Sequence, residues 1–388
     1  MKLKKTNMTK KNFFRSSNFF VLVFVFFLAG VMLSGCAAPA GSYKKGGKDQ
    51  DLAKQTIRIL VQEGKTGFKI DGAKGSSRLN LEYAGGKAVT LNGELKKLPL
   101  RFHPKWRFIY IDRRPYRGVV EVREDKGALI VINELRLENY IAGIINNEIS
   151  SKWPLEAIKA QSVIARTYAI YQMEERKDNL FHLTGTHMDQ VYTGAAVEDR
   201  ASFRAVKKTT GEVLFYKGRP ALTLYHSNAG GETEYARNVW GANEPYLRAV
   251  KSRHDKDAPN FRWELALSKI SLGEKLRAAG YEIGLPARIK VKKKTKTGRV
   301  TALTIKDKDG RMIAMKGEDL RKALGYARLR STLFKVGRSR KGFVFKGRGS
   351  GHGVGLSQWG AKGMAEDGAG YKKILRHYYA GTTIKKLY

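Results

Sequence analysis

The chain has 388 residues, of which 74 are lysine or arginine and only 35 are aspartate or glutamate, so its formal net charge at pH 7 is +39. This length supports two domains with full cores, and so large a positive charge requires an anionic partner or surface. Cys36 is the only cysteine, which excludes an internal disulfide and leaves the fold to rest on core burial.

Residues 1–35 have the pattern of a signal peptide. Six basic residues precede an apolar run from Phe19 to Met32 that is short for a membrane span. The segment ends in Leu33-Ser34-Gly35-Cys36, which resembles a bacterial lipobox, where the cysteine is lipidated and becomes the new N-terminus. We therefore expect an exported lipoprotein that is anchored to the membrane through Cys36 and faces the periplasm or cell wall. An uncleaved anchor helix is the alternative.

Without residues 1–35 the chain keeps 353 residues and a net charge of +33. An exported lipoprotein does not meet nucleic acid, and the basic residues are spread along the chain, so no nucleic-acid partner is expected. Anionic cell-envelope polymers and lipid headgroups fit this location better. A basic surface that serves only solubility is the alternative.

Residues 36–55 are small and polar and predict a flexible tether. Residues 56–125 contain short alternating runs separated by Gly, Asp and Lys turns, namely TIRILV, FKI, LNLEY, AVTL, FIYI and GVVEV. This pattern predicts an antiparallel accessory β region. Whether it is a spacer or a glycan-contacting face is left open by the sequence.

A helix is predicted from Leu137, because apolar residues recur at helical spacing through Ile145. The next position on that stripe is Glu148, so a carboxylate stands where a core residue is expected. Ser150, Ser151 and Pro154 predict a turn and a second helix, which places Glu148 at the mouth of a helix-turn-helix corner.

The environment of Glu148 follows from its neighbours. Partial burial against Ile144, Ile145 and Trp153 would raise its pKa and keep it protonated. The alternative is a helix-end carboxylate in solvent or in an ion pair with a residue such as Arg166. The second helix is rich in alanine, and its polar residues need partners; these are Gln161, Arg166 and Tyr168.

Residues 182–194, HLTGTHMDQVYTG, place His182, His187 and Asp189 close together. Two histidines and a carboxylate suggest zinc, but their spacing is not that of a helical pair and no cysteine is near. We expect no cofactor, with zinc at His182 and His187 as the alternative, and interpret the segment as a loop that lines a cleft near Glu148.

Strand-like segments follow at GEVLFY and around Ser227, where Gly230 and Gly231 mark a tight backbone site. His226 and Ser227 are adjacent and lie outside any G-x-S-x-G elbow, so a serine hydrolase is not indicated. Residues 264–337 predict an inserted α+β subdomain with a hairpin at Asp309-Gly310. The Lys292–Lys296 run is interpreted as a solvated turn.

In GRGSGHGVGLSQWGAKGMAEDG, which spans residues 347–368, glycine occupies every second position from 347 to 355. An extended run would have one face without side chains, suited to close approach of backbone or of a flat ligand near His352 and Gly353. A phosphate-binding loop lacks the required βαβ context and Lys-Ser/Thr pair. Ser357 is a predicted N-cap, and a last helix is predicted to stop at Gly381.

The runs Leu137–Tyr168 and Gly347–Gly368 resemble two signatures of the stage II sporulation protein D family, also called the SpoIID/LytB or amidase-enhancer domain. Asp189, Gln190 and Tyr192 match its D-Q-x-Y pattern, and the Ser227 segment matches its Ser, Gly-Gly and Trp-Gly pattern. The similarity covers about residues 130–388. Some members carry a Cys/His metal site near His182, from which this sequence departs.

The resemblance implies that Glu148 is the catalytic acid of a peptidoglycan lytic transglycosylase. It also gives a set of expected substrate-binding residues: Gln161, Arg166, Tyr168, Asp189, Gln190, Tyr192, Ser227, Gly230, Gly231, His352, Gly353, Ser357 and Gln358. The fold is expected to be α+β, with mixed and antiparallel sheets, a helical corner carrying Glu148, and a catalytic domain over 126–388 that includes the inserted subdomain.

The reaction that the resemblance implies is cleavage of the bond between N-acetylmuramic acid and N-acetylglucosamine. The expected substrates are peptide-stripped glycan strands, and the expected product is a 1,6-anhydromuramic end. One carboxyl group suffices when it first protonates the leaving oxygen and then accepts the proton of the C6 hydroxyl. Two alternatives stay open: a non-catalytic module that enhances an N-acetylmuramoyl-L-alanine amidase, and a hydrolysing muramidase, which needs two carboxylates. An amidase partner fits each of these hypotheses.

Overall fold

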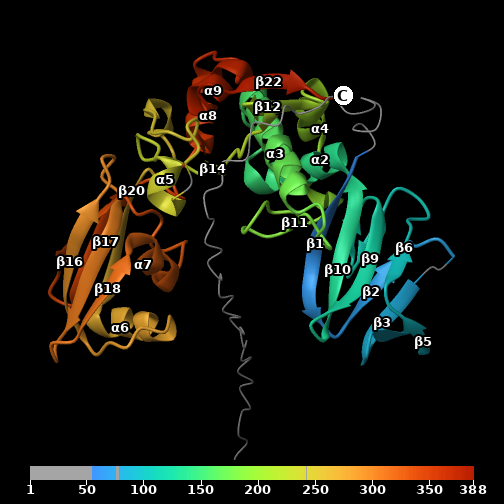
Figure 1. Cartoon of the computed structure of the whole chain (residues 1–388), viewed down its shortest axis with the longest axis horizontal. Coiled ribbons are helices and arrows are strands. Elements are labelled where there is room, and N and C mark those ends of the chain that lie inside the picture. The colour runs from blue at the N-terminus through green and yellow to red at the C-terminus, as the bar shows by residue number, and fades with distance from the viewer. Residues whose placement is uncertain (1–54, 76–77, 242) are drawn as a thin grey trace, which may run out of the picture. The chain divides into compact units, whose positions relative to one another are not determined.

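The computed structural model describes residues 55–75, 78–241 and 243–388. The predicted signal peptide, the lipidation site Cys36 and nearly all of the predicted tether lie outside these residues. The described part combines several small sheets with helices (Figure 1), which confirms the predicted α+β class. Among the described helices, none is both long and apolar enough to cross a membrane.

Two sheets form the N-terminal region. The first has the order β11-β1-β10-β9-β6, with β11 parallel to β1 and the other pairs antiparallel. Its strands are β1 (Thr56–Lys65), β6 (Leu100–Phe102), β9 (Val119–Asp125), β10 (Ala128–Arg136) and β11 (Leu183–Thr184). The sheet thus joins strands from the predicted accessory region to strands of the predicted catalytic domain.

The second sheet is antiparallel and has the order β5-β4-β3-β2-β7-β8. Its strands are β2 (Gly67–Asp71), β3 (Arg78–Gly85), β4 (Ala88–Leu91), β5 (Glu94–Lys97), β7 (Ile109–Ile111) and β8 (Arg114–Tyr116). Alternating apolar residues from both sheets enter one core with the first central helix, as the alternating pattern of the sequence predicted.

The predicted helical corner is present as α2 (Leu137–Glu148) and α3 (Leu155–Glu175). The apolar stripe of α2 is buried, and Glu148 is its last residue. Alanines let α3 approach β12 (Glu212–Tyr216), α8 (Gln358–Glu366) and α9 (Tyr371–Tyr378). Ser357 caps α8 by accepting a hydrogen bond from Gly360 N at 3.1 Å, as predicted, whereas α9 ends before the predicted stop at Gly381.

Shorter elements connect these helices to the rest of the chain. They are η1 (Ala195–Val197), α4 (Arg200–Lys208), β13 (Arg219–Pro220), β14 (Tyr225–His226), α5 (Ala236–Trp240), η2 (Arg253–Asp255), β21 (Leu356–Ser357) and β22 (Thr383–Lys386). β12 pairs with β22 near the C-terminus (Figure 1), and β14 runs parallel to β21. The latter pair brings His226 next to the glycine-rich motif.

The inserted subdomain has two antiparallel three-stranded sheets around one apolar cluster, which extends from Trp263 to Phe345. Its elements are β15 (Arg262–Ser268), α6 (Lys269–Ala278), β16 (Pro286–Lys294), β17 (Val300–Asp307), β18 (Met312–Lys316), α7 (Gly317–Leu324), β19 (Phe334–Arg338) and β20 (Gly342–Arg348). Lys292–Lys294 continue β16, where Lys293 and Lys294 pair with β17, so the turn predicted for 292–296 is wrong for these three residues and present only at Lys296. Their side chains are exposed, as predicted.

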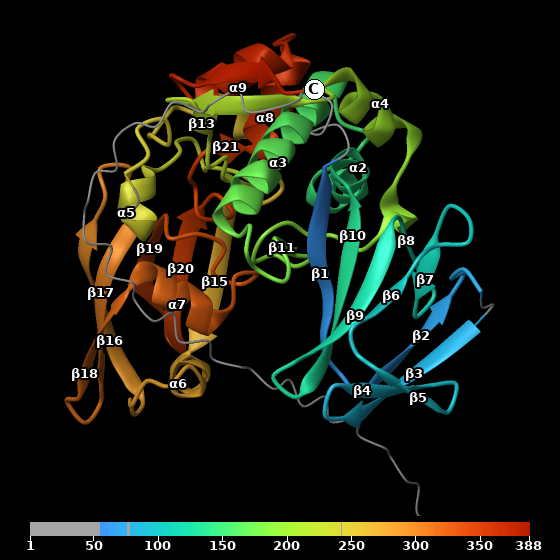
Figure 2. The ribbon, with the colours of Figure 1, turned by 45° about the vertical axis from the view of Figure 1, so that its right-hand side comes forward.

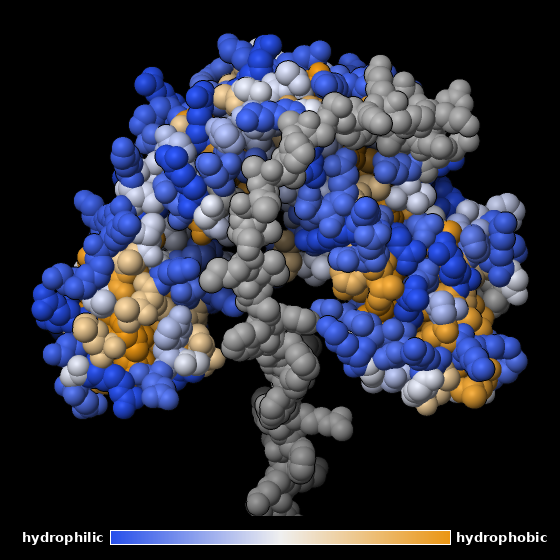
Figure 3. Space-filling model, viewed as in Figure 1, coloured by the Kyte–Doolittle hydropathy of each residue, from blue (hydrophilic) through white to orange (hydrophobic). Residues whose placement is uncertain are grey.

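The glycine-rich motif is not one extended run. The strand ends at Arg348, and Gly349, Gly351, Gly353 and Gly355 all have positive φ, between 72° and 107°. The expected alternation of a bare face and a side-chain face is therefore wrong, since each left-handed glycine turns the backbone. Hydrophilic residues cover most of the surface seen in Figure 3, as the charge of the chain requires.

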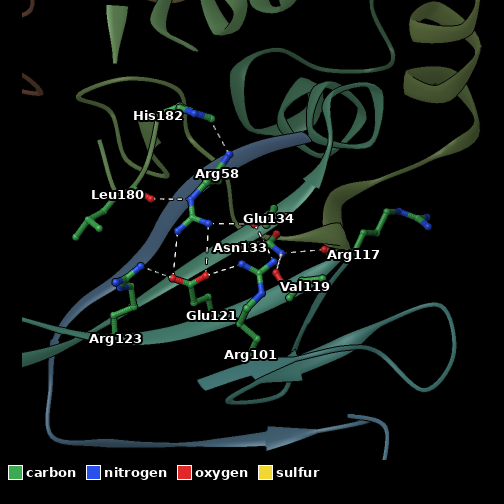
Figure 4. Close-up of polar contacts among 10 residues, drawn as sticks. All are labelled: Arg58, Arg101, Arg117, Val119, Glu121, Arg123, Asn133, Glu134, Leu180 and His182. Atoms are coloured by element: carbon green, nitrogen blue, oxygen red, sulfur yellow. Dashed lines mark hydrogen bonds and ion pairs between the residues drawn. The ribbon is translucent and has the colours of Figure 1, made fainter. Parts of the chain in front are cut away.

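An ion-pair network lies on the first N-terminal sheet (Figure 4). Glu121 on β9 is 2 % exposed and receives hydrogen bonds from Arg58, Arg101 and Arg123. Burial alone would raise the pKa of Glu121, but the hydrogen bonds from Arg58 and Arg123 outweigh it and lower that pKa. Arg58 also donates from its backbone to His182 Nδ1 at 3.1 Å and from its side chain to Leu180 O at 2.7 Å. The network thereby ties β1 to the loop that begins near residue 180.

Candidate active site

Glu148 lies at the wall of a cavity of about 460 Å³. The lining comes from several distant segments: the end of α2, α3, the 187–191 loop, β14 and its flanks, α5, α7 and the glycine-rich motif. The lining residues are Glu148, Tyr168, His187, Met188, Asp189, Val191, Thr223, Leu224, Tyr225, His226, Trp240, Glu318, Arg321, Tyr326, Gly351 and His352.

Two groups hold the Glu148 carboxyl in place. Val191 N donates to Glu148 Oε1 at 2.9 Å, and the Tyr225 hydroxyl is a second hydrogen-bond partner. The neighbouring Asn147 side chain donates to Val191 O at 3.1 Å, so consecutive residues of α2 bind both backbone groups of Val191. Burial raises the pKa of Glu148, and the two hydrogen bonds offset only part of this rise.

A set of buried side chains supports Tyr225. Gln190 donates to the Tyr225 hydroxyl at 3.4 Å and accepts from the Tyr140 hydroxyl at 3.0 Å. His352 Nδ1 accepts from Val354 N at 3.1 Å, which leaves its Nε2–H to donate to Tyr225 O at 2.9 Å. Burial lowers the pKa of His352 to about 3, so this imidazole is neutral in the working range and orients Tyr225 without carrying charge.

The other two carboxylates of the cavity wall are paired. Asp189 accepts from Arg176 at 3.1 Å and from the Tyr168 hydroxyl at 3.0 Å, and Thr184 N donates to it at 2.8 Å. Glu318 forms an ion pair with Arg321 at 3.2 Å. Within the described residues, Glu148 is the one carboxyl group of this wall without an ion pair. It is therefore the group best suited to hold and transfer a proton.

Glu148 also lines a second hollow, of about 400 Å³. Ser227 and Gln358 line it together with Trp153 and Trp359, whose rings meet edge to face with centroids 5.1 Å apart. Aromatic faces and amide or hydroxyl groups are what a sugar ring needs for packing and hydrogen bonding. Glu148 thus belongs to the lining of both hollows.

The structure places the expected substrate-binding residues in two groups. Those that line one of the two hollows are Tyr168, Asp189, Ser227, His352 and Gln358. The others do not line them: Gln161, Gln190, Tyr192 and Ser357 are buried, Arg166 is fully buried and paired with Glu138 at 2.7 Å, and Gly230, Gly231 and Gly353 serve backbone packing or turns. The ion pair of Arg166 with Glu138 also leaves Glu148 free of that partner.

The glycines pack against protein. A Cβ on Gly353 would lie 2.3 Å from Arg299 Nη2, and one on Gly351 would lie 2.7 Å from His226 Cβ. Arg299 is itself buried, which lowers its pKa to about 10. The expected close approach is therefore made by side chains at Gly351 and Gly353 and by backbone atoms of Ala229 and Leu224 at Gly349 and Gly355.

Several residues of the site were not singled out from the sequence. Tyr225 and Val191 bind Glu148, Asn147 binds Val191, and Trp240 and Glu318 line the cavity. Asn147 directly precedes Glu148 at the end of a predicted helix, and this position was the sequence signal that could have identified it as a residue of the site. Glu318 lies far along the sequence in the inserted subdomain, where no local pattern distinguishes it.

The histidines of the 182–194 loop have separate environments. His182 Nδ1 is occupied by Arg58 N, while His187 lines the cavity. Both carboxylate oxygens of Asp189 accept hydrogen bonds, from Arg176, Tyr168 and Thr184. Over the described ranges, no group of three His, Cys, Asp or Glu side chains is placed to hold a metal ion.

Comparisons with known proteins agree with this arrangement. A family model described as Stage II sporulation protein matches residues 125–216, and a second, Domain of unknown function (DUF8618), matches residues 242–355. The chain is 32% identical to Stage II sporulation protein D of Bacillus amyloliquefaciens, over 71% of this chain and 87% of that one. The chain belongs to the stage II sporulation protein D family.

Two further relatives extend the comparison. An uncharacterized protein of Brachyspira hyodysenteriae is 32% identical over 84% of this chain and 82% of its own length. The Amidase enhancer of Bacillus subtilis is 31% identical over 63% of this chain and 40% of that protein.

Proposed function

We propose that this protein is an exported peptidoglycan lytic transglycosylase that cleaves the bond between N-acetylmuramic acid and N-acetylglucosamine in peptide-stripped glycan strands. The observation that carries the proposal is Glu148: its pKa is raised by burial, it has no ion pair among the described residues, and it lines two hollows. Membership of the family supports action on the cell wall.

The reaction needs one proton-transferring group. Neutral Glu148 donates its proton to the glycosidic oxygen as the bond from C1 to that oxygen breaks. The resulting carboxylate is stabilised by Val191 N–H and Tyr225, and it then accepts the proton of the C6 hydroxyl while O6 bonds to C1. The product end is a 1,6-anhydro sugar, and Glu148 is neutral again.

A second candidate function is that of a module that recruits or stimulates an amidase. The name of the Bacillus subtilis relative, Amidase enhancer, favours it. This function would use the same glycan-binding recesses without requiring the proton of Glu148. A hydrolysing muramidase is a variant of the first proposal. Asp189 and Glu318 line the same cavity, and Glu318 is then the better candidate for the second carboxylate because both oxygens of Asp189 already accept hydrogen bonds.

The test replaces Glu148 by glutamine, which keeps shape and hydrogen bonding but transfers no proton. Cleavage of purified glycan strands, with and without stem peptides, is followed by mass spectrometry of the product ends. We expect turnover to fall by about 10²- to 10⁴-fold, the usual value of acid-base assistance, while binding of glycan changes little.

Glu318→Gln is the matched control, since it neutralises a carboxylate on the same cavity wall. A transglycosylase is supported if the parent protein yields 1,6-anhydro product ends and the Glu318→Gln control keeps near-parental turnover. A comparable collapse of the control, with reducing ends from the parent, would identify a muramidase. Equal stimulation of an amidase by parent and Glu148→Gln, with no cleavage by either, would establish the binding module instead.

A further inference from the structure

A groove of about 710 Å³ lies in the inserted subdomain, in the part of the chain that matches a family of unknown function. It is formed by the sheet β15-β20-β19, shown in Figure 2, and by the turn between β16 and β17. We call it the basic groove, after the five basic side chains that line it: Arg262, Lys294, Lys335, Lys346 and Arg348. All five are exposed.

Strand register explains how the positive charges gather. The side chains of Trp263 on β15 and Phe345 on β20 point into the apolar cluster. Because side chains alternate along a strand, their neighbours on each strand point to the opposite face of the sheet. On that face Arg262 lies directly opposite Arg348, and Lys335 lies directly opposite Lys346. Two like-charged cross-strand pairs on one face are unfavourable for the sheet itself.

Few negative charges compensate this face. Glu264 is the one carboxylate of the groove lining, and it pairs with Lys346 at 3.2 Å. Among the described residues, Arg262, Lys294, Lys335 and Arg348 have no ion-pair partner. Two like-charged pairs with a single compensating carboxylate are explained if an anion binds to this face.

The lining chemistry favours phosphates over sugar rings. The aromatic residues of the groove, Trp263 and Phe334, are 9 % and 3 % exposed and offer no platform for a sugar face. The hollow beside Glu148, with Trp153 and Trp359, has the opposite character. Arginine binds phosphate through two parallel N–H donors, and lysine adds point charges. The five cations come from the four strands β15, β16, β19 and β20, which suits several anionic groups in sequence. A polymer chain can enter a groove that a flat membrane cannot.

We propose that the basic groove binds an anionic polymer of repeating phosphodiesters, of the polyol-phosphate type. The bound polymer would then hold the protein on the cell envelope, and the groove that binds it is separate from the Glu148 cavity. Since binding of such a polymer requires no chemistry at Glu148, the proposal stands or fails independently of the proposed glycan cleavage.

The test is the double variant Arg348→Glu/Lys335→Glu, assayed with fluorescent poly(glycerol phosphate). Each change converts a like-charged cross-strand pair into an opposite-charged one, so the thermal transition is expected to stay or rise. Affinity for the polymer is expected to fall on the order of 10- to 100-fold, and its dependence on salt to weaken. Cleavage of short peptide-free glycan fragments should stay at the parental rate.

Lys372→Glu/Lys373→Glu on α9 is the matched control, because it makes the same change in net charge with exposed residues outside the groove. Retained polymer binding by this control, with loss in the groove variant, supports the site. Equal losses in both would show binding to net charge alone and overturn it. A groove variant that binds the polymer like the parent, or that loses binding only to phosphatidylglycerol vesicles or to glycan strands, would also overturn the assignment.

Discussion

Glu148 shows how a few contacts set the chemistry of one carboxyl group. Burial at the cavity wall favours its neutral form, while Val191 N–H and the Tyr225 hydroxyl favour its ionised form. Burial is the larger effect, so the pKa is raised. A general acid must begin protonated and then be stable as a base, and this balance suits both stages.

If Glu148 is the acid of the proposed cleavage, the pH dependence of that reaction follows from this balance. Because the protonated form of Glu148 is required first, turnover is expected to fall as pH rises through its raised pKa. Tyr225→Phe removes a hydrogen bond that lowers that pKa, so the pKa rises further and the alkaline limb of the pH–rate profile should move to higher pH. The profile is measured with glycan strands of fixed length.

Tyr326→Phe is the control for this prediction, since Tyr326 lines the same cavity and is not among the groups that shift the pKa of Glu148. Its alkaline limb should coincide with that of the parent. An alkaline limb that moves to lower pH in Tyr225→Phe would contradict the assignment of Tyr225. His352, with its pKa of about 3, should contribute no ionisation near neutrality.

At the scale of elements, the glycine-rich motif fixes the join between the inserted subdomain and the helical corner. Each of Gly349, Gly351, Gly353 and Gly355 has a left-handed conformation, and each meets protein atoms where a side chain would begin. Gly353 approaches Arg299, and Gly351 approaches His226. The motif therefore positions His352, which lies between them and orients Tyr225.

Gly353→Ala tests this packing. Its Cβ would lie 2.3 Å from Arg299 Nη2, and its φ is 86°, so we expect the free energy of unfolding to fall by about 3 kcal/mol or more. Gly381→Ala is the control, with a φ of 85° and no atom within 4 Å of the added Cβ; it should lose only about 1–2 kcal/mol. The free energies of unfolding of both variants are measured by denaturant titration. Equal decreases in the two variants would show that backbone strain alone, and not the contact with Arg299, causes the loss of stability.

A second element-scale feature is the link between β1 and the 182–194 loop. β11 pairs in parallel with β1, and Arg58 adds hydrogen bonds to Leu180 and His182. The same loop carries Asp189 and Val191 to the cavity. The N-terminal sheet therefore contributes to the site by fixing this loop, whichever of its surfaces contacts glycan.

At the scale of the whole molecule, the sequence predicts a lipid anchor in addition to the candidate active-site cavity and the basic groove. The anchor is predicted from the lipobox-like sequence before Cys36, which lies outside the described residues. Cys36→Ser should release the protein from membranes or leave its signal peptide uncleaved. Membrane fractionation and gel migration measure this, and a variant that behaves like the parent in both would refute lipidation.

Local patterns were enough to predict much of the fold. The alternation in residues 56–125 predicted strands, and the stripe from Leu137 to Ile145 predicted α2 with Glu148 at its end. These signals succeed because period and turn chemistry are properties of neighbouring residues. The same reasoning failed for Gly349–Gly355 and for Lys292–Lys294, where backbone conformation is decided by packing and strand pairing with distant segments.

The sequence by itself determined the fold class, the helical corner and the candidate acid, because each has a short-range pattern or a motif around it. Only the tertiary structure decided which groups surround that acid. Tyr225, Val191 and Glu318 reach the cavity from separate elements, and Arg166 and Gln190 turn into the core. Burial and hydrogen-bond partners arise where distant segments meet, so the raised pKa of Glu148 and the repulsive pairs of the basic groove follow from three-dimensional packing and strand register.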